Sequence, residues 1–574
     1  MNKTFIYSSP KVGSRKKWIF GIQMKNKASL EAQIRKINSL IKANDLEGAK
    51  SQLADAFERF PNNDRVQKAI LFFNDQNSKS QIHNPPADVI RNILSLFENN
   101  NFSDVIKLAD ELLKIFKNSP QILIISALSN VALEQFDEAE KYFHAAFEID
   151  PFSPQLHYNY ATFLIKISKQ TEALASLNKA VAIKPDYFQA YNNIGRLHNE
   201  IFEFADAKAA FKKAIKIKPN FTEALNNLGS AHEFLQEYDQ AILAYEKAFK
   251  TNPKFGHAAF NKSLLRLKQC QFEQGFDLYE NRWQTHQFAN LSPNTQKLQW
   301  RGEVNKKIFI WSEQGVGDVI MFSSILNEAS VASLKIIFQC DERLIPLFKR
   351  SIKGNVELVS LDQKVDDFCY DFHIPVGSLA KVFRRNITDF KKAKSPYLKA
   401  DNTRSHQIRQ KLGMLKSQPL IGISWSGGDQ TKIQSRARSM DAQKLISVFK
   451  NIDCKLVNLQ YGNVDQVINH AKDELGIEIA KAPEIDIFED IDGLASLISA
   501  CDYVVTVANL NIHLAGALGT KAKLLLPSIC DWRWGINRKD SYWYKDVTLY
   551  RQETLGDWDK PLIGLSHDLS SIVS

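Results

Sequence analysis

Two different hydrophobic patterns divide the chain. In the first half, apolar and small residues keep helical spacing inside a longer period of 34 residues, which two sets of residues mark: Pro151, Pro185, Pro219 and Pro253, and Asn159, Asn193, Asn227 and Asn261. A fixed period of this length predicts pairs of helices stacked into a superhelix. After about Trp300 the period ends, and short β-rich runs alternate with helical stretches. That alternation predicts parallel sheets covered by helices.

Small residues hold fixed positions in the repeat, and bulky residues keep step with them. The columns are Ala127, Ala161, Gly195, Gly229 and Ser263; Ala139, Ala173, Ala207, Ala241 and Gly275; and the bulky Phe143, Leu177, Phe211, Tyr245 and Tyr279. The pattern resembles the tetratricopeptide repeat, with a proline closing each second helix. We expect a repeat superhelix over residues 83–290 and diverged helical repeats over residues 28–82, with the polar stretch Gln76–Ala87 as a break.

The second half of the chain is predicted to form two doubly wound halves, residues 300–400 and 415–574, joined by a polar link. The predicted strands are Lys307–Trp311, Leu334–Cys340, Val356–Leu361 and Asp371–Pro375 in the first half, and Pro419–Ser424, Lys455–Gln460, Asp502–Val507 and Ala522–Pro527 in the second. Such sheets bind ligands at the carboxyl ends of their strands, and two halves form a cleft.

The net charge of +10 and the pI of about 9.0 favour acidic partners, although ordinary solubility also explains them. Such partners include phosphate-bearing ligands, anionic glycans, nucleic acid and membrane surfaces. The sequence carries no nucleic-acid recognition motif, so we predict no nucleic-acid partner. The six cysteines are scattered singly, without a CxxC motif or a Cys/His cluster. This argues against a structural zinc site and suits buried thiols in a reducing compartment.

Residues 1–27 are expected to form a basic N-terminal tail. They lack the continuous apolar core of a signal peptide, and no run of about 18 apolar residues occurs that would predict a transmembrane helix. A peripheral membrane contact would use Lys11, Arg15, Lys16, Lys17 and Trp18. A disordered tail is the preferred interpretation, and the expected location is the cytoplasm.

The first candidate site follows the first predicted strand. Gly315 and Gly317 allow a tight turn and let a ligand approach the backbone, and Asp318 stands near a helix start, where amide groups are free. Taken alone, the motif also fits an aspartate that caps the helix.

The second candidate site joins strand Asp502–Val507 to the predicted helix Asn511–Leu518. Asn509 precedes the helix, His513 lies one turn inside it, and Gly516 lets the helix lie close to the sheet. A helix N-terminus suits an anion such as a diphosphate. An ordinary packing helix with a buried, hydrogen-bonded histidine fits equally well.

A loop with three cations forms a third candidate. Lys432 lies within the stretch Gly427–Gln434, and Arg436 and Arg438 follow it. Such side chains neutralise phosphates well, arginine above all. A solvated loop with incidental charge is the alternative.

Several ordered motifs resemble one enzyme family. They are Glu313-Gln-Gly-Val-Gly-Asp-Val-Ile, Gly422-Ile-Ser-Trp-Ser-Gly-Gly, Arg436-Ala-Arg-Ser439, His513-Leu-Ala-Gly-Ala-Leu-Gly, and Leu525-Leu-Pro followed by Asp531-Trp-Arg-Trp534. Over about residues 305–565 the chain resembles the C-terminal domains of bacterial repeat proteins similar to glycosyltransferase family nine, the ADP-heptose:lipopolysaccharide heptosyltransferases.

This resemblance implies a GT-B fold, an inverting reaction and no metal. Asp318 would be the general base that takes a proton from the acceptor hydroxyl. The nucleotide-diphosphate sugar donor would contact Gly315, Gly317, Lys432, Arg436, Arg438, Asn509, His513 and Gly516. The heptosyltransferases carry Asp and then Thr or Ser where this chain has Ala508 and Asn509.

Two further patterns are interpreted as structural. The C-terminal aromatic cluster would suit stacking on a sugar or base, but core packing is preferred for its members, Trp532, Trp534, Trp543, Tyr544 and Trp558. Asp490 and Asp492 spell a DxD motif, but they precede the predicted helix Gly493–Ala500, so helix capping is preferred over metal binding.

The row of repeat asparagines is a candidate acceptor site. In protein O-GlcNAc transferases, asparagines at the matching repeat position line the concave face and hold a substrate's main chain, and Asn159, Asn193, Asn227 and Asn261 match that position. An amide offers both a donor and an acceptor, so a regular row can hold an extended backbone. Consensus residues that hydrogen-bond neighbouring helices are the alternative.

We therefore expect an α-helical tetratricopeptide-repeat superhelix followed by an α/β GT-B fold of two Rossmann-like halves. The expected function is transfer of a sugar from a nucleotide-diphosphate donor to a protein or glycan acceptor that the repeats present. The alternative is a non-catalytic scaffold for protein–protein interaction with a degenerate glycosyltransferase domain. Ala508 favours the scaffold, whereas Asp318 and His513 favour the enzyme.

Overall fold

The computed structural model describes residues 29–80, 85–392, 395–413, 418–428, 433–482 and 484–573. The chain divides into two compact units, Met1–Pro219 and Asn220–Ser574. The predicted basic tail and its membrane contact lie outside the described residues. Among the described helices, none is both long and apolar enough to cross a bilayer.

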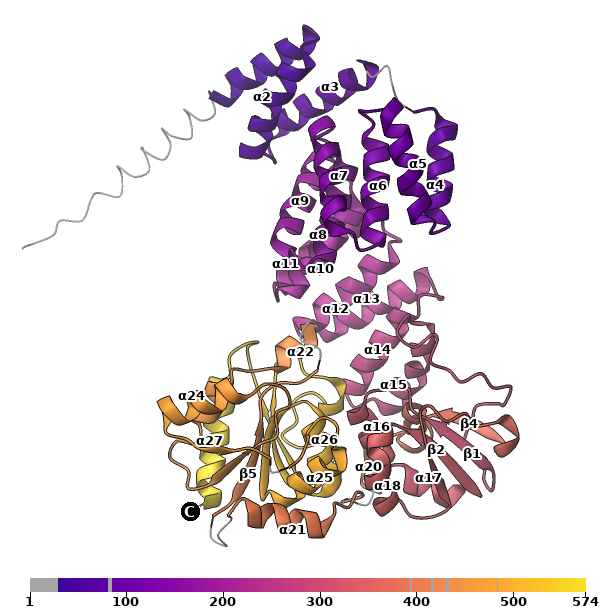
Figure 1. Cartoon of the computed structure of the whole chain (residues 1–574), viewed down its shortest axis with the longest axis vertical. Coiled ribbons are helices and arrows are strands. Elements are labelled where there is room, and N and C mark those ends of the chain that lie inside the picture. Colours follow the sequence, from indigo (N-terminus) through magenta and orange to yellow (C-terminus); the bar gives the residue numbers. More distant parts are fainter. Residues whose placement is uncertain are drawn as a thin grey trace, which may run out of the picture. The chain divides into compact units, whose positions relative to one another are not determined.

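The first unit consists of helical hairpins (Figure 1). A helix over residues 29–42 is followed by α2 (Leu46–Arg59), α3 (Asp64–Ser80), α4 (Ala87–Glu98), α5 (Phe102–Ile115), α6 (Pro120–Ala132), α7 (Phe136–Ile149), α8 (Pro154–Lys166), α9 (Gln170–Ile183), α10 (Phe188–Glu200) and α11 (Phe204–Ile217). Helix α3 thus continues into the stretch that was predicted to begin a break at Gln76.

The second unit opens with the same kind of hairpin. Its repeat elements are α12 (Thr222–Phe234), α13 (Tyr238–Thr251), α14 (Gly256–Lys268), α15 (Phe272–Tyr279) and the 3-10 helix η1 (Glu280–Gln284). The turn inside each repeat hairpin contains a residue with φ of 60° to 65°: Glu134, Ser168, Phe202, Gln236 and Cys270. Asn44 and Asn100 have the same φ of 60°, so the upstream hairpins share this turn.

The small-residue column exists because a ring lies against it. A Cβ added at Gly195 would lie 2.5 Å from the Phe211 ring, and one added at Gly229 would lie 2.5 Å from the Tyr245 ring. Phe211 and Tyr245 belong to the bulky column of the same repeats. The two columns are therefore the two sides of one helix–helix contact, and this confirms the register predicted from the sequence.

Replacing Gly229 with Ala is expected to lower the free energy of unfolding of the second unit by about 1–3 kcal/mol, the usual cost of overpacking. The new methyl group would overlap the Tyr245 ring, which is almost fully buried. Chemical denaturation with urea would show the loss as a lower midpoint. The matched control is Gly315→Ala, because a Cβ at Gly315 meets nothing within 4 Å. Equal midpoints for the two variants would contradict the packing argument.

A four-stranded parallel sheet forms the first α/β half, in the order β3-β2-β1-β4. Its strands are β1 (Lys307–Trp311), β2 (Lys335–Cys340), β3 (Val356–Ser360) and β4 (Phe372–Pro375). Its helices are α16 (Val316–Ser323), α17 (Leu326–Ala332), η2 (Glu342–Leu344), α18 (Ile345–Ser351), η3 (Asp367–Cys369), η4 (Val376–Ser378), α19 (Leu379–Phe383) and α20 (Ile387–Phe390).

A six-stranded parallel sheet forms the second half, in the order β10-β9-β8-β5-β6-β7. Its strands are β5 (Leu420–Ser424), β6 (Lys455–Asn458), β7 (Ile479–Ala480), β8 (Tyr503–Val507), β9 (Lys521–Leu526) and β10 (Val547–Arg551). Its helices are α21 (Asn402–Lys411), α22 (Ile433–Arg438), α23 (Ala442–Ser447), α24 (Asp465–Leu475), α25 (Ile491–Ala500), α26 (Leu510–Leu518), η5 (Trp532–Trp534) and α27 (Asp559–Val573).

The predicted parallel sheets with covering helices are confirmed, and all eight predicted strands lie within one or two residues of the observed bounds. One difference matters for the site. The helix predicted over Val319–Leu326 begins three residues earlier, so Asp318 lies inside the first turn of α16. Strands β7 and β10 were not predicted, because β7 has only two residues and β10 follows an irregular aromatic segment.

Candidate functional site

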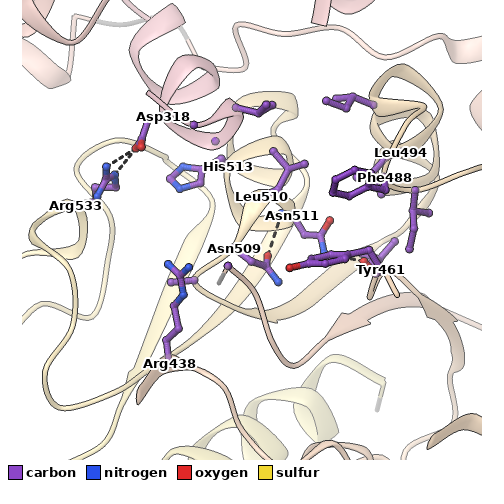
Figure 2. A pocket seen from close by; sticks show the side chains of 18 of the residues that line it. Asp318, Arg438, Tyr461, Phe488, Leu494, Asn509, Leu510, Asn511, His513 and Arg533 are labelled. Atoms are coloured by element: carbon purple, nitrogen blue, oxygen red, sulfur yellow. Dashed lines mark hydrogen bonds and ion pairs between the residues drawn. The ribbon is translucent and has the colours of Figure 1, made fainter. Parts of the chain in front are cut away.

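A pocket of about 380 Å³ lies where the strand order of the second sheet reverses. Strands β5 and β8 are neighbours there, with β6 on one side and β9 on the other, and such switch points leave a crevice at the carboxyl ends of the strands. The pocket is lined from loops after β1, β5, β6, β8 and β9, and Gly315, Val316, Gly317 and Asp318 bring the first half into its wall. The two α/β halves therefore share one pocket, as the sequence predicted (Figure 2).

Asp318 lies on the pocket wall and does not cap its helix. The N-cap of α16 is Gly315, which makes no side-chain cap bond, and Asp318 is the third residue of the helix. Its carboxylate points to Arg533, whose Nε donates to Asp318 Oδ1 at 2.6 Å and whose Nη2 pairs with the same oxygen. The capping alternative for Asp318 is therefore wrong.

Arg533 holds a second carboxylate as well. Its Nη1 pairs with Asp531 Oδ1 at 2.5 Å, and its backbone N–H donates to that oxygen at 3.0 Å. Burial raises the pKa of Asp318 above its usual value, against the opposing charge of Arg533. Burial acts in the same direction on Asp531, but the charge and hydrogen bonds of Arg533 outweigh it and lower the pKa of that carboxyl. Asp318 is therefore the stronger base of the two acids.

His513 lies one turn inside α26 and is neutral. Burial lowers its pKa to about 3, and the charges of Arg533 and Arg438 act in the same direction. Its Nδ1 lies 2.7 Å from the hydroxyl of Tyr544, and its ring packs so closely on Gly317 that a Cβ there would lie 3.0 Å from His513 Cδ2. His513 is thus both a buried, hydrogen-bonded histidine and part of the pocket lining.

Asn509 lines the pocket, but its amide is engaged within the protein. Oδ1 accepts from the backbone N–H of Asn511 at 3.0 Å and from Thr506 Oγ1 at 3.1 Å, and Nδ2 donates to Ser424 Oγ at 3.1 Å and to Ser426 O at 3.0 Å. Asn509 is the N-cap of α26 and ties β5 to β8. This arrangement suits a positioning role better than the predicted direct contact with a donor.

The loop cations divide between the pocket and the solvent. Arg438 lines the pocket, and its Nε donates to Gly427 O at 3.3 Å. Gly428 has a φ of 73°, and a Cβ there would lie 2.0 Å from Arg438 Nη2, so only glycine suits this position. Arg436 is exposed and does not belong to the lining, because two residues along a helix point to opposite sides. Lys432 lies outside the described residues.

The predicted glycines also divide. Gly315 and Gly317 line the pocket. Gly516 lies away from the lining, and a Cβ there would lie 2.3 Å from the Tyr544 ring. Gly516 therefore serves helix packing and does not belong to the pocket lining in which its role in donor binding was predicted.

The end of the pocket away from Asp318 is apolar and aromatic, and the sequence analysis did not predict it. Tyr461 and Phe488 are 40% and 54% exposed, with ring centroids 5.8 Å apart. The apolar side chains around them are those of Leu459, Ile487, Ile491, Leu494 and Leu510. Arg343 from the first half donates to Phe488 O at 3.1 Å and so links the two halves at this end.

Core packing is confirmed for the aromatic cluster, and helix capping is confirmed for Asp490 but not for Asp492. All five members of the C-terminal aromatic cluster are buried, although Trp534 also lines the pocket. Asp490 is the N-cap of α25 and accepts from the Gly493 N–H at 2.7 Å, while Asp492 pairs with Arg350 of the first half.

The asparagine column makes contacts between and within repeat helices. In the first unit, Asn159 Oδ1 accepts from Gln155 Nε2 at 3.0 Å, and Asn193 is buried. In the second unit, Asn261 Nδ2 donates to Asn226 Oδ1 at 3.0 Å, across one repeat, and Asn226 Nδ2 donates to Asn227 Oδ1 at 3.5 Å. The Asn261 bond joins α14 to α12, as the structural alternative predicts, whereas the Asn159 bond stays within α8.

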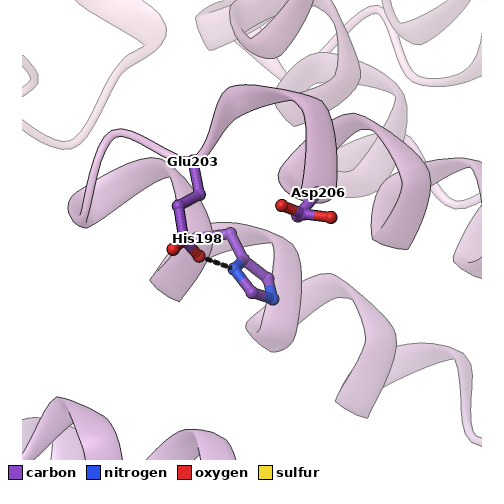
Figure 3. A group of neighbouring side chains, drawn as sticks. All are labelled: His198, Glu203 and Asp206. Atoms are coloured by element: carbon purple, nitrogen blue, oxygen red, sulfur yellow. Dashed lines mark hydrogen bonds and ion pairs between the residues drawn. The ribbon is translucent and has the colours of Figure 1, made fainter. Parts of the chain in front are cut away.

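Figure 3 shows a cluster in the repeats whose ligand atoms lie close enough to hold a metal ion, formed by His198, Glu203 and Asp206. His198 Nδ1 lies 2.7 Å from Glu203 Oε2 across the turn between α10 and α11. The same pair recurs one repeat later, where His232 Nδ1 lies 2.5 Å from Glu237 Oε2. Because Gln240 replaces the third acid there, the His–Glu pair is better explained as a tie across the repeat turn.

Family models identify the helical part. Models of the tetratricopeptide repeat match residues 126–188, 188–221 and 222–255. The helical hairpins over residues 126–255 are tetratricopeptide repeats. These matches end at residue 255 and so do not bear on the α/β halves.

A curated relative is protein FlbA of Caulobacter vibrioides, which is 29% identical over 313 residues. That alignment spans 51% of this chain and 51% of FlbA, so the chain matches about half the length of this relative.

Solved structures similar to this chain include MamA, YrrB and PilF. MamA is 23% identical and covers 28% of this chain and 94% of its own, with a TM-score of 0.26. YrrB, a tetratricopeptide-repeat protein described as having an unusual peptide-binding site, is 20% identical and covers 34% of this chain and all of its own, with a TM-score of 0.27. PilF of Pseudomonas aeruginosa is 18% identical and covers 36% of this chain and 92% of its own, with a TM-score of 0.31.

Proposed function

We propose that the α/β part of this chain is an inverting, metal-independent glycosyltransferase of the GT-B type that uses a nucleotide-diphosphate sugar. The observation that carries this proposal is the polarity of one pocket. Its far end is aromatic and apolar, its centre is the start of α26, and its near end holds Asp318 with two arginines. A nucleotide sugar carries matching groups in the same order: a flat base, joined through its ribose to a diphosphate, and then the transferred sugar.

The donor would lie along the pocket in that order. Its base would stack on Tyr461 and Phe488, since every nucleobase has a flat face that stacks on an aromatic ring. Its diphosphate would lie at the first turn of α26 beside Arg438, where the partial positive charge of a helix start adds to the guanidinium. Its sugar would then lie near Asp318.

The reaction follows from that placement. Asp318 takes the proton of an acceptor hydroxyl as the hydroxyl oxygen attacks the anomeric carbon of the sugar. The bond from this carbon to the diphosphate breaks, and the nucleoside diphosphate leaves with the electron pair. Arg438 and the first turn of α26 stabilise the charge that develops on the leaving group. The acceptor is a protein segment or a glycan presented by the repeats.

Titration of the purified chain with ADP, UDP, GDP and CDP tests this proposal. We expect one of them to bind with a Kd in the range of about 1 µM to 1 mM that substrates usually show. Tyr461→Ala is expected to weaken this binding about fivefold or more, because stacking on one base is worth about 1–3 kcal/mol. Phe368→Ala is the matched control, since Phe368 is 84% exposed and lies outside the pocket lining. Isothermal titration calorimetry measures both.

Absence of binding by all four nucleoside diphosphates would contradict the enzyme and favour a second function. The second candidate is a scaffold for protein–protein interaction, and the tetratricopeptide repeats support it, because stacked repeats form extended surfaces that bind partners. The absence of the family's acid at Ala508 fits the same candidate.

A further inference from the structure

The last repeat hairpin reaches the loops that carry Asp318 and Arg533. It consists of α14, α15 and η1, which belong to the same compact unit as both α/β halves. Two of its residues, Tyr279 and Arg282, stand at the centre of the contacts. Both side chains are almost fully buried, at 2% and 0% exposure, although they lie at the end of the repeats.

Arg282 fixes the segment that precedes the Asp318 loop. Its Nη2 donates to Glu313 Oε1 at 3.1 Å and to Ser378 Oγ at 2.7 Å, and its Nη1 donates to Glu280 Oε1 at 2.8 Å. Its guanidinium also lies over the ring of Tyr279, 4.6 Å from the centroid. The Glu313 carboxylate has no exposed surface and also accepts from the Gly377 N–H at 3.2 Å.

Tyr279 holds the next residue of this segment, Gln314. Its hydroxyl accepts a hydrogen bond from the amide of Gln314, the residue directly before Gly315. Glu313 and Gln314 are therefore both anchored by the repeat hairpin. The following residues, Gly315 to Asp318, lead directly into the pocket wall.

The same hairpin also packs against the segment that carries Arg533, the ion-pair partner of Asp318. The ring of Tyr279 lies 6.2 Å from that of Trp532, and the ring of Phe276 lies 6.0 Å from it, edge to face. Trp532 in turn lies 4.8 Å from the Arg533 guanidinium. One repeat hairpin thus supports the chain on both sides of the Asp318–Arg533 ion pair.

We infer that this hairpin is part of the candidate site and that Tyr279 and Arg282 are positioning residues for the Asp318 loop. The inference goes beyond a role of the repeats in presenting an acceptor. Its catalytic consequence rests on the proposed function, but its structural consequence does not. Removal of the bonds from Tyr279 and Arg282 loosens the segment from Glu313 to Asp318. It removes no group that touches the donor in the proposed placement.

Tyr279→Phe is the decisive variant, because it deletes one hydroxyl and leaves the ring packing in place. Tyr245→Phe is its matched control: Tyr245 occupies the same position one repeat earlier, is equally buried, and directs its hydroxyl to Ser230 within the repeats at 3.2 Å. Phe211 fills the same position two repeats before Tyr279, so phenylalanine is compatible with the repeat. Both variants are therefore expected to fold.

Hydrogen–deuterium exchange of the full chain tests the structural consequence. Amides of residues 314–319 are expected to exchange about fivefold or more faster in Tyr279→Phe, as they do when a local segment opens more easily, and to be unchanged in Tyr245→Phe. Unchanged exchange in Tyr279→Phe, or the same increase in both variants, would overturn the inference.

The catalytic consequence is measured as kcat and KM for sugar transfer. The donor is the sugar nucleotide whose nucleoside diphosphate binds the wild-type chain. Tyr279→Phe is expected to lower kcat about tenfold with the donor KM within about twofold, because a misplaced base affects the transition state and not donor binding. A change in KM alone would contradict the positioning role. If no nucleoside diphosphate binds the wild-type chain, the proposed function fails, and the exchange comparison still decides the inference.

Discussion

Replacing Asp318 with Asn is expected to reduce sugar transfer by about 10²- to 10⁴-fold, the usual contribution of a general base. The amide keeps the size of the side chain and a hydrogen bond to Arg533, but it cannot take the proton of an acceptor hydroxyl. Affinity for the nucleoside diphosphate is expected to stay within about twofold, because the base acts at the sugar end of the pocket. Single-turnover kinetics with the sugar nucleotide, together with calorimetric titration, measure the two quantities.

Asp531→Asn provides the matched comparison for this result. Asp531 is bound to the same guanidinium and lines the same pocket, but its pKa is lowered, so it is the weaker base. We expect its replacement to cost less than about tenfold in transfer. Equal losses in the two variants would show that the charge around Arg533, and not proton removal by Asp318, limits the reaction.

The parts of the fold that follow from local pattern could be predicted. The period of 34 residues placed the repeat helices, because each repeat buries the same face against the next. Strands such as Lys307–Trp311 and Tyr503–Val507 are short apolar runs buried on both faces, and both were found. Gly315, Gly317 and Asp318 were found because they follow such a strand, where a parallel sheet places its ligands.

The parts of the site that depend on contacts between distant segments could not be predicted. Arg533 lies 215 residues after Asp318, and its local sequence does not show which carboxylate it contacts. The motif Asp531-Trp-Arg-Trp534 was recognised, but its tryptophans were interpreted as core residues and Arg533 was given no role. Tyr461 and Phe488 share this difficulty, since neither belongs to a motif and only the sheet order brings them together.

Local pattern also misled the interpretation where one residue type serves two purposes. Asn509 and Gly516 both fit a phosphate-binding helix start. In the structure Asn509 caps the helix, and Gly516 makes room for Tyr544. Capping and close packing demand the same residue types as anion binding, so the sequence alone does not separate them.

Replacing Arg533 with Gln is expected to lower transfer about 100-fold at pH 7, a typical loss when a catalytic group such as Asp318 loses the contact that positions it. It is also expected to move the acidic limb of the pH–rate profile to higher pH. Burial raises the pKa of Asp318, and the Arg533 charge opposes that rise. Without this charge, Asp531 repels the carboxylate of Asp318, and the Arg438 charge opposes that repulsion. The pKa of Asp318 therefore rises further in the variant, and the base is protonated over a wider acidic range.

Arg533→Lys separates the charge of Arg533 from its geometry. Lysine keeps the positive charge but cannot hold two carboxylates with a planar fork, so we expect the acidic limb to stay close to its wild-type position while the maximal rate falls. The sign of the effect is fixed, because transfer requires deprotonated Asp318 and is lost as the pH falls through its pKa. A profile of kcat/KM against pH for the wild type and both variants tests this. A shift to lower pH in Arg533→Gln would exclude Asp318 as the group that the profile reports.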